Sequence, residues 1–306
     1  MTDTGRVPPP VIAVVGATAA GKSDLGVVLA RALDGEVVNA DSMQLYRGMD
    51  IGTAKLSPAE QQGVPHHLLD VWEVTEAASV EEYQRLSRAV LDRLAVARRP
   101  AVLVGGSGLY VRAALDDLHF PATDPQLRSR LEAELEDVGP APLHARLATL
   151  DPDAAAVILA SNGRRIVRAL EVVSLTGRPF AATLPTPRYA VVARQVGLAV
   201  PRAALDERIA RRVDRMWEQG LVEEVRALER SGLRSGRTAS RALGYAQVLR
   251  LLDGEYDEAT ARAETVRVTR RLARRQESWF RRDPRVRWLP YDAPDLLALA
   301  LEVSVA

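Results

Sequence analysis

The segment VIAVVGATAAGKS, residues 11–23, decides the fold of this chain. Its first five residues are apolar and mostly β-branched, which predicts a buried strand over Val11–Val15. Apolar residues at helical spacing predict a helix over 22–33. The turn between strand and helix fits the P-loop pattern G-x4-G-K-[ST], and its members are Gly16, Ala17, Thr18, Ala19, Ala20, Gly21, Lys22 and Ser23.

A P-loop between a strand and a helix predicts a phosphate site. Its glycines let the backbone curl so that N–H groups converge on an anion, and the helix N-terminus adds about half a positive charge. Lys22 adds a point charge, and the Ser23 hydroxyl can ligate Mg²⁺. The chain lacks the N-K-x-D pattern that reads guanine, which argues against a GTPase.

The alternation of strands and helices predicts an α/β fold. Strands over 36–40 and 101–104, with an amphipathic helix over 80–98 between them, continue the pattern that begins at the P-loop. This β–α–β order favours a P-loop NTPase-like parallel sheet with helices on both faces. Ligands of such sheets bind beyond the carboxyl ends of the strands.

The middle of the chain predicts a separate helical insertion. From 118 to about 184 only helical segments occur, and a linker with two prolines follows at 183–188. Residues 190–200 are apolar and β-branched, so we expect the chain to return to the sheet there. The predicted domains are therefore a core of residues 1–117 and 190–306 and an insertion of residues 118–189. The core should end in helices over 205–231, 240–252 and 255–282.

Composition excludes several classes of protein. The chain has no cysteine, so disulfides, cysteine nucleophiles and zinc–cysteine sites are absent. No apolar run approaches the roughly 20 residues of a membrane helix, and residues 1–10 contain no apolar signal region. We therefore expect a cytoplasmic protein without a membrane contact. The formal net charge is only +1, so any surface for nucleic acid must be local.

Asp41 is a candidate for chemistry because it directly follows the strand over 36–40. In this topology it should lie beside the P-loop, at the mouth of the sheet. A carboxylate there can take a proton from an incoming nucleophile or hold Mg²⁺ through water, and general-base help contributes about 10²–10⁴-fold. A turn or helix-capping role explains the same position equally well.

Arginines supply two further candidate sites. Arg208 and Arg212 are four residues apart and share a helix face, where they would either reach the ligand's phosphates or remain at the surface. Ten arginines against three acidic residues occupy 262–287, which favours contact with RNA phosphates over an ordinary solvated face, since aromatic residues interleave with the charges. His66 and His67 lack metal-ligand spacing, so we interpret them as structural.

Ordered blocks of sequence carry a resemblance to a known family. They are the P-loop, DSMQLY at 41–46, MDIGTAK at 49–55, PHHLLD at 65–70, GGSGLY at 105–110, RRIVRALEV at 164–172, GY at 244–245 and RRQESWFR at 274–281. Together they resemble the tRNA dimethylallyltransferases, also called tRNA isopentenyltransferases, in their bacterial form. The blocks span nearly the whole chain in order.

The resemblance implies an activity and a set of ligands. It implies transfer of a dimethylallyl group from dimethylallyl diphosphate to N6 of the adenosine adjoining the anticodon of tRNA on its 3′ side. It also implies release of diphosphate, a requirement for Mg²⁺, and a P-loop that holds the diphosphate of the prenyl donor rather than ATP. The target base must leave its stack to react, so base flipping is expected. No obligate protein partner is predicted, and we expect a monomer.

The same resemblance implies roles for individual residues. Asp41 is the base on the adenine N6–H, and Ser107 stands where the family usually has threonine, at the reacting centre. The residues for which it implies contact with tRNA are Asp41, Ser42, Met43, Gln44, Ser107, Arg128, Arg164, Arg165, Arg168, Arg241, Gly244, Tyr245, Arg274, Arg275, Gln276, Trp279 and Arg281.

Two positions depart from the family pattern, and two other classes of function remain open. Ala246 replaces a common basic residue, and Arg274 replaces a frequent lysine. A small-molecule P-loop kinase, or an isopentenyltransferase that acts on free adenine nucleotide, would need neither the helical insertion nor the arginine-rich helix. A non-catalytic nucleotide switch is disfavoured because no base-reading motif accompanies the P-loop.

Overall fold

The computed structural model describes residues 9–180 and 184–305. It divides into two compact units, one that runs to Asp117 and resumes at Pro187, and a second over Leu118–Thr186. The first residue of the predicted linker, Thr183, lies outside the described residues, as does the stretch 1–8 in which we noted no signal region.

The first unit contains, among its described residues, a six-stranded sheet in the order β3-β2-β4-β1-β5-β6. Every pairing is parallel, as the sequence predicted. The central strand β1 lies between β4, where Ile12 is beside Val102, and β5, where Val14 is beside Val196. The strands are β1 (Val11–Val15), β2 (Glu36–Asn39), β3 (His66–His67), β4 (Ala101–Gly105), β5 (Ala193–Ala199) and β6 (Val286–Pro290).

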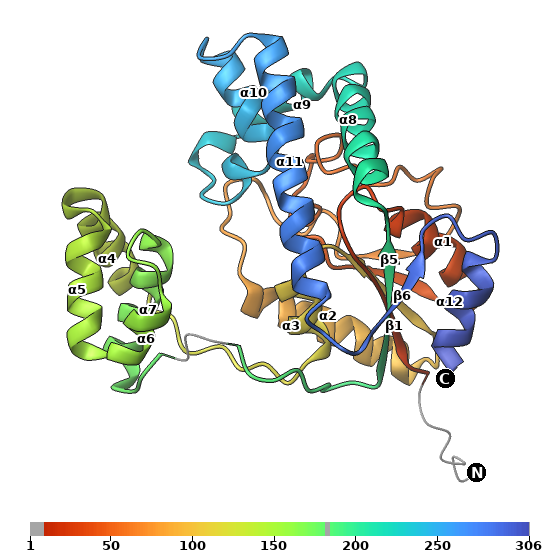
Figure 1. Ribbon diagram of the computed structural model, residues 1–306, viewed down its shortest axis with the longest axis horizontal. Coiled ribbons are helices and arrows are strands. Elements are labelled where there is room, and N and C mark those ends of the chain that lie inside the picture. Colours follow the sequence, from red (N-terminus) through yellow and green to blue (C-terminus); the bar gives the residue numbers. More distant parts are fainter. Residues whose placement is uncertain (1–8, 181–183, 306) are drawn as a thin grey trace. The chain divides into compact units, whose positions relative to one another are not determined.

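Helices cover both faces of this sheet (Figure 1). On one face α1 (Lys22–Ala32) packs against β4 and β2, and α12 (Leu296–Val305) packs against β5, β6 and α1. On the other face α2 (Val80–Val96) and α3 (Gly108–Leu115) pack against β4. All five residues of β1 are buried as a result, which is why its sequence is a continuous apolar run rather than an alternating one.

A layer of helices lies beyond the carboxyl ends of the strands (Figure 1). It consists of α8 (Arg202–Glu218), α9 (Leu221–Arg230), α10 (Tyr245–Leu252) and α11 (Glu258–Phe280). The single helix predicted over 205–231 is wrong. Gly220 has φ 96°, and this left-handed backbone ends α8 and starts α9 in a new direction. The helix predicted over 240–252 starts only at Tyr245, after a 3-10 turn over Ala239–Arg241.

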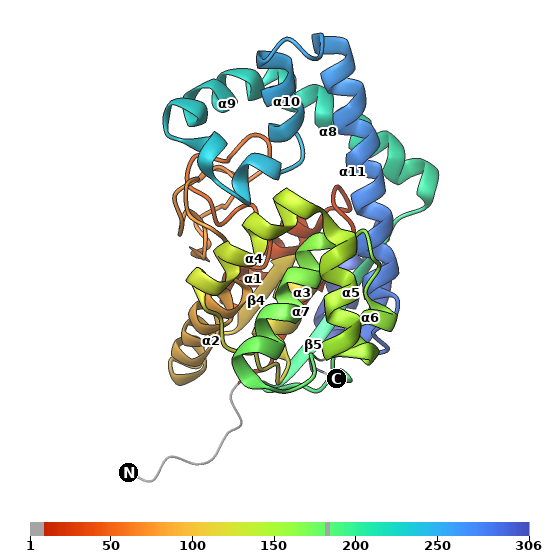
Figure 2. The same cartoon turned by 90° about the vertical axis from the view of Figure 1, so that its left-hand side faces the viewer.

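The second unit is a four-helix cluster with its own core (Figure 2). Among its described residues the helices are α4 (Pro125–Val138), α5 (Pro140–Leu150), α6 (Pro152–Val157) and α7 (Gly163–Thr176). Each begins after a residue that ends or caps a helix, such as Asp124, whose carboxylate accepts the N–H groups of Gln126 and Leu127. The unit is all-helical, as the sequence predicted.

Sequence patterns missed four elements: β3, β6, α3 and α12. Strand β3 is only two residues long, and β6 alternates between buried and exposed positions, so neither forms the apolar run by which the other strands are recognised. Both lie at the edges of the sheet. They widen the sheet without changing the position of the P-loop.

Candidate active site

The P-loop leaves β1 at the middle of the sheet and takes the shape of an anion cradle. Gly16 and Gly21 have φ of 132° and 101°, and Ala19 has φ 62°, so three of its residues have left-handed backbone. No side chain caps α1 at Gly21, so the first N–H groups of the helix face the loop without a side-chain acceptor. Lys22 donates to the carbonyl of Ala17 at 2.8 Å.

The ammonium group of Lys22 is costly to keep charged in this place. Burial lowers its pKa from 10.5 to about 8, the negative charge of Asp41 opposes that fall, and the positive charge of Arg212 adds to it. Burial also lowers the pKa of the Arg212 guanidinium. Two partly desolvated cations next to a single carboxylate leave an excess of positive charge that a bound anion can neutralise.

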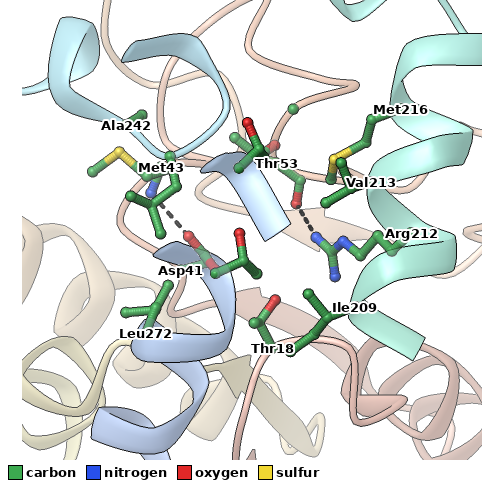
Figure 3. Close-up of a pocket in the computed structure, with 14 residues that line it drawn as sticks. Thr18, Asp41, Met43, Thr53, Ile209, Arg212, Val213, Met216, Ala242 and Leu272 are labelled. Atoms are coloured by element: carbon green, nitrogen blue, oxygen red, sulfur yellow. Dashed lines mark hydrogen bonds between the residues drawn. The ribbon is translucent and has the colours of Figure 1, made fainter. Parts of the chain in front are cut away.

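A cavity of about 100 Å³ adjoins the P-loop. Asp41 enters it from one side and Arg212 from the other, and Thr18 of the P-loop lies at its edge (Figure 3). The remaining wall is largely apolar, with contributions from the helical layer and from the segment after Asp41: Met43, Ile209, Val213, Met216, Ala242 and Leu272. The cavity thus joins cations and a carboxylate to a surface that favours hydrocarbon.

Asp41 is held in place by the end of strand β2. The buried side chain of Asn39 accepts the N–H of Asp41 at 2.8 Å and donates to its carbonyl at 3.0 Å. The Asp41 Oδ1 in turn accepts the N–H of Met43 at 2.9 Å. The Asp41 carboxylate therefore caps its own turn and also lines the cavity, so the two readings left open by the sequence are compatible.

Ser107 lies next to the same turn. Its hydroxyl accepts the N–H of Ser42 at 3.2 Å and lies 3.2 Å from the Ser42 hydroxyl. It follows β4, as Asp41 follows β2, and these two strands are neighbours. The candidate base and the candidate hydroxyl are therefore brought together by the carboxyl ends of adjacent parallel strands.

Arg208 and Arg212 both face the site rather than the surface. Arg208 Nε donates to the carbonyl of Ala19 in the P-loop at 2.7 Å, and Arg212 donates to the carbonyl of Thr53 at 2.9 Å. Their spacing of four residues places them on one face of α8, and the fold directs this face toward the P-loop. Both side chains are half-buried and contact backbone carbonyls of the site, while their contact with the diphosphate stays a prediction.

The carboxyl-terminal half of α11 packs on the loops of the site. Gln276 is buried, accepts the N–H of Thr18 at 2.8 Å and donates to the carbonyl of Gly106 at 3.0 Å. The Trp279 ring lies so close to Gly108 that any Cβ at that position would overlap its Nε1. Gln276 and Trp279, in the last turns of α11, therefore contact the loops of the site directly. The next residue, Phe280, is part of the buried core.

Comparisons with known proteins agree on one family. A family model described as IPP transferase matches residues 44–283. A protein of Thermobifida fusca named tRNA dimethylallyltransferase is 70% identical over 294 residues, which cover 94% of this chain and 92% of that protein. One of the same name from Streptomyces avermitilis is 69% identical, with 95% and 93% covered. The chain belongs to the IPP transferase family.

The fold agrees with that membership. A solved structure of a tRNA isopentenylpyrophosphate transferase from Bacillus halodurans has a TM-score of 0.70 and 39% sequence identity to this chain, and it covers 97% of this chain and 95% of its own. No helix in the described part of the chain is long and apolar enough to cross a membrane.

The helical unit of this IPP transferase contains four arginines for which the resemblance implies tRNA contact. Two of them, Arg128 and Arg168, converge on the buried carboxylate of Glu171, and Arg168 also donates to backbone carbonyls at Pro121 and Ala122. The other two, Arg164 and Arg165, are exposed at the start of α7. One pair therefore ties the unit together, while the other is presented to solvent.

In the core unit, the remaining residues implied to bind tRNA fall into two groups. Arg241, Arg274, Arg275 and Arg281 are exposed, although Arg281 also pairs with Glu277. Tyr245 is fully buried, its hydroxyl donates to Glu224, and its ring fills the space beside Gly52. The Tyr245 side chain offers no surface to RNA in this structure.

The remaining polar candidates are His66, His67 and Asn39. His66 Nδ1 contacts the carbonyl of Val64 at 2.8 Å, and His67 Nε2 contacts the carboxylate of Glu36 at 2.6 Å, which are structural roles. The described residues contain no group of three histidines or acids that could hold a metal. Sequence reasoning missed the role of Asn39, although a polar residue inside the apolar run of β2 was a signal that could have identified it.

Proposed function

We propose that this chain transfers the dimethylallyl group of dimethylallyl diphosphate to N6 of the adenosine adjoining the anticodon of tRNA on its 3′ side. Membership of the IPP transferase family supports this, as do the relatives named tRNA dimethylallyltransferase. The observation that carries the proposal is the cavity in which Arg212 and the P-loop meet a carboxylate and an apolar wall.

The chain's cations would hold the diphosphate. Lys22 lies near Arg212, and Arg208 contacts the P-loop at the Ala19 carbonyl; partial burial makes each charge more effective than it would be in water. The C–O bond of the donor breaks with its electron pair going to the diphosphate, so these cations stabilise the charge that develops on the leaving group. The apolar wall receives the five-carbon group.

Asp41 would take the proton that N6 must lose. As the new N6–C bond forms, one hydrogen of the amino group leaves to a carboxylate oxygen. Oδ1 of Asp41 already accepts the Met43 N–H, and among the described residues no hydrogen bond is donated to Oδ2, so Oδ2 is assigned as the acceptor. The hydroxyls of Ser42 and Ser107 lie 3.2 Å apart at the turn that follows Asp41 and would orient the incoming base.

Mg²⁺ fits the donors present. The Ser23 hydroxyl is a hard oxygen ligand, and Mg²⁺ usually binds one or two such protein groups together with phosphate oxygens and water. Bound there, the ion would neutralise charge on the diphosphate. Ser23 at the start of α1 would hold it directly, as in other P-loops.

Exposed arginines of both units would bind the tRNA. Arg164 and Arg165 belong to one unit, and Arg241, Arg274 and Arg275 to the other. Each arginine that contacts a phosphate releases about one counterion, so binding should weaken with salt.

One assay tests the proposal. Wild-type protein, Mg²⁺ and labelled dimethylallyl diphosphate are incubated with unmodified tRNA, with the same tRNA carrying guanosine at the target position, and with adenosine monophosphate. Label should enter the first RNA alone. Label in the free nucleotide would instead identify an enzyme for small acceptors, and cleavage of ATP would identify a kinase.

A further inference from the structure

The segment Met49–Lys55 forms part of the active-site wall without belonging to a helix or strand. Thr53 lines the cavity, and its carbonyl accepts Arg212 at 2.9 Å. The same carbonyl accepts the Gln44 side chain at 3.2 Å. The position of this one carbonyl therefore affects the direction of a guanidinium that faces the P-loop.

A single carboxylate holds the segment from the other side. Glu224 Oε2 accepts the N–H of Asp50 at 3.1 Å and of Ile51 at 2.7 Å, and Oε1 accepts the N–H of Gly52 at 3.2 Å. Three successive N–H groups that converge in this way form an anion-binding concavity. Here the anion is the protein's own side chain, delivered by the first turn of α9.

A fourth donor completes the arrangement. The Tyr245 hydroxyl donates to Glu224 Oε1 at 2.5 Å, and its ring fills the space where a Cβ at position 52 would lie. An ionised carboxylate offers about four acceptor positions, and this one meets four donors. Glutamine in the same place would bring an amide N–H₂ against N–H donors, so the match requires glutamate.

We infer that Glu224, with Tyr245, is a positioning residue for prenyl transfer. It fixes the backbone of Asp50, Ile51 and Gly52, so that the Thr53 carbonyl orients Arg212 toward the diphosphate. This inference rests on the proposed function for its meaning in catalysis. The contacts on which it depends lie within the core unit and hold for any diphosphate ligand.

The test is a double-mutant cycle between Glu224→Gln and Arg212→Lys. Calorimetry with Mg²⁺ and inorganic diphosphate gives the affinity of the diphosphate site, filter binding gives the affinity for tRNA, and steady-state kinetics give KM for dimethylallyl diphosphate. We expect Glu224→Gln to weaken diphosphate binding and raise the donor KM by about tenfold. In the Arg212→Lys background the same change should have an effect of less than about twofold, because coupled residues are not additive.

Two variants complete the design. Glu223→Gln changes the neighbouring exposed glutamate, which pairs with Arg226, and should behave as wild type. Tyr245→Phe removes one of the four donors while keeping the ring, and should give a smaller effect in the same direction. Tyr245→Phe therefore still tests the positioning role if Glu224→Gln does not fold.

The outcomes distinguish failure of the positioning role from failure of the proposed function. A donor KM and diphosphate affinity that stay at wild-type values, or effects that add fully across the cycle, would overturn the positioning role even if the melting temperature fell. Unchanged tRNA affinity together with weakened diphosphate binding would support it. Failure of the proposed function would appear differently, as wild-type protein that binds diphosphate and transfers no prenyl group.

Discussion

The two lysines of this chain should respond in opposite ways to loss of their charge. Lys22 belongs to the P-loop, where its ammonium group donates a hydrogen bond to the Ala17 carbonyl. Lys55 is buried between two carboxylates, with its Nζ 2.5 Å from Asp50 and 2.6 Å from Asp70. We expect Lys22→Met to stabilise the ligand-free protein and Lys55→Met to destabilise it.

The expected gain in stability on Lys22→Met follows from the pKa of Lys22. A fall from 10.5 when unfolded to about 8 when folded corresponds to about 3 kcal/mol of destabilisation at neutral pH, at about 1.4 kcal/mol per pKa unit. Solvent beside the partly exposed side chain reduces this figure, and loss of the hydrogen bond to Ala17 costs about 1 kcal/mol. Lys22→Met should therefore gain about 1–2 kcal/mol in the free energy of unfolding.

The direction of the Lys22 effect and the pH range in which it acts follow from the same two pKa values. Because the folded pKa is below the unfolded pKa, the cost of the charge is fully present below pH 8, shrinks as pH rises from 8, and is gone above 10.5. Urea unfolding at pH 7 and pH 10 measures it. Inorganic diphosphate with Mg²⁺ should stabilise wild type by about 2.7 kcal/mol at a hundred times its Kd, and the variant much less.

A result that refutes this reasoning is easy to recognise. If Lys22→Met were less stable than wild type at pH 7, the lysine would be a structural cation and not one held for a ligand. A gain that is the same at pH 7 and pH 10 would show that packing, and not charge, is responsible.

Three other predictions concern function. Asp41→Asn keeps the shape of the side chain without its basicity, so single-turnover prenyl transfer should slow by about 10²-fold or more while tRNA affinity hardly changes; a normal rate would exclude Asp41 as the base. The affinity for diphosphate should fall above pH 8 as Lys22 loses its proton, and Lys22→Arg should remove that inflection; a pH profile without it would reject the assignment. Replacing Arg164 and Arg165 together with glutamine should reduce the log–log salt slope of tRNA binding by about 1–2 without changing the affinity for diphosphate; an unchanged slope would exclude them from the RNA surface.

Because Arg128 and Arg168 pair with Glu171, mutating either of them tests folding stability as well as contact with tRNA. Arg168 and Arg128 both neutralise Glu171, whose side chain is fully buried. Removing Arg168 would leave that carboxylate with less compensation, which costs folding free energy whether or not RNA binds. The resemblance gave these arginines a single role; in the structure Arg128 and Arg168 pair with the buried Glu171, whereas Arg164 and Arg165 are exposed.

Local features of the site were accessible from the sequence. A P-loop is a strand, a turn and a helix within 13 residues, and each part has its own local preference, so the pattern specifies the geometry. Asp41 was identified because it directly follows a strand, whereas Ser107 came only from the family resemblance; parallel pairing of β2 and β4 brings the two to one edge. The helical insertion was recognised because its breaks and caps lie next to one another along the chain.

Contacts between distant segments were decided by the tertiary structure alone. Helical spacing showed that Arg208 and Arg212 share a face of α8, and only the fold shows that this face meets the P-loop, at the carbonyl of Ala19, 189 residues earlier in the chain. Gln276 on Thr18 and Glu224 on Gly52 are of the same kind. Sequence periodicity reports that a face is buried, because burial depends on the side chain's own polarity. Which groups meet there depends on loop geometry and on how the helices pack, and no local preference encodes that.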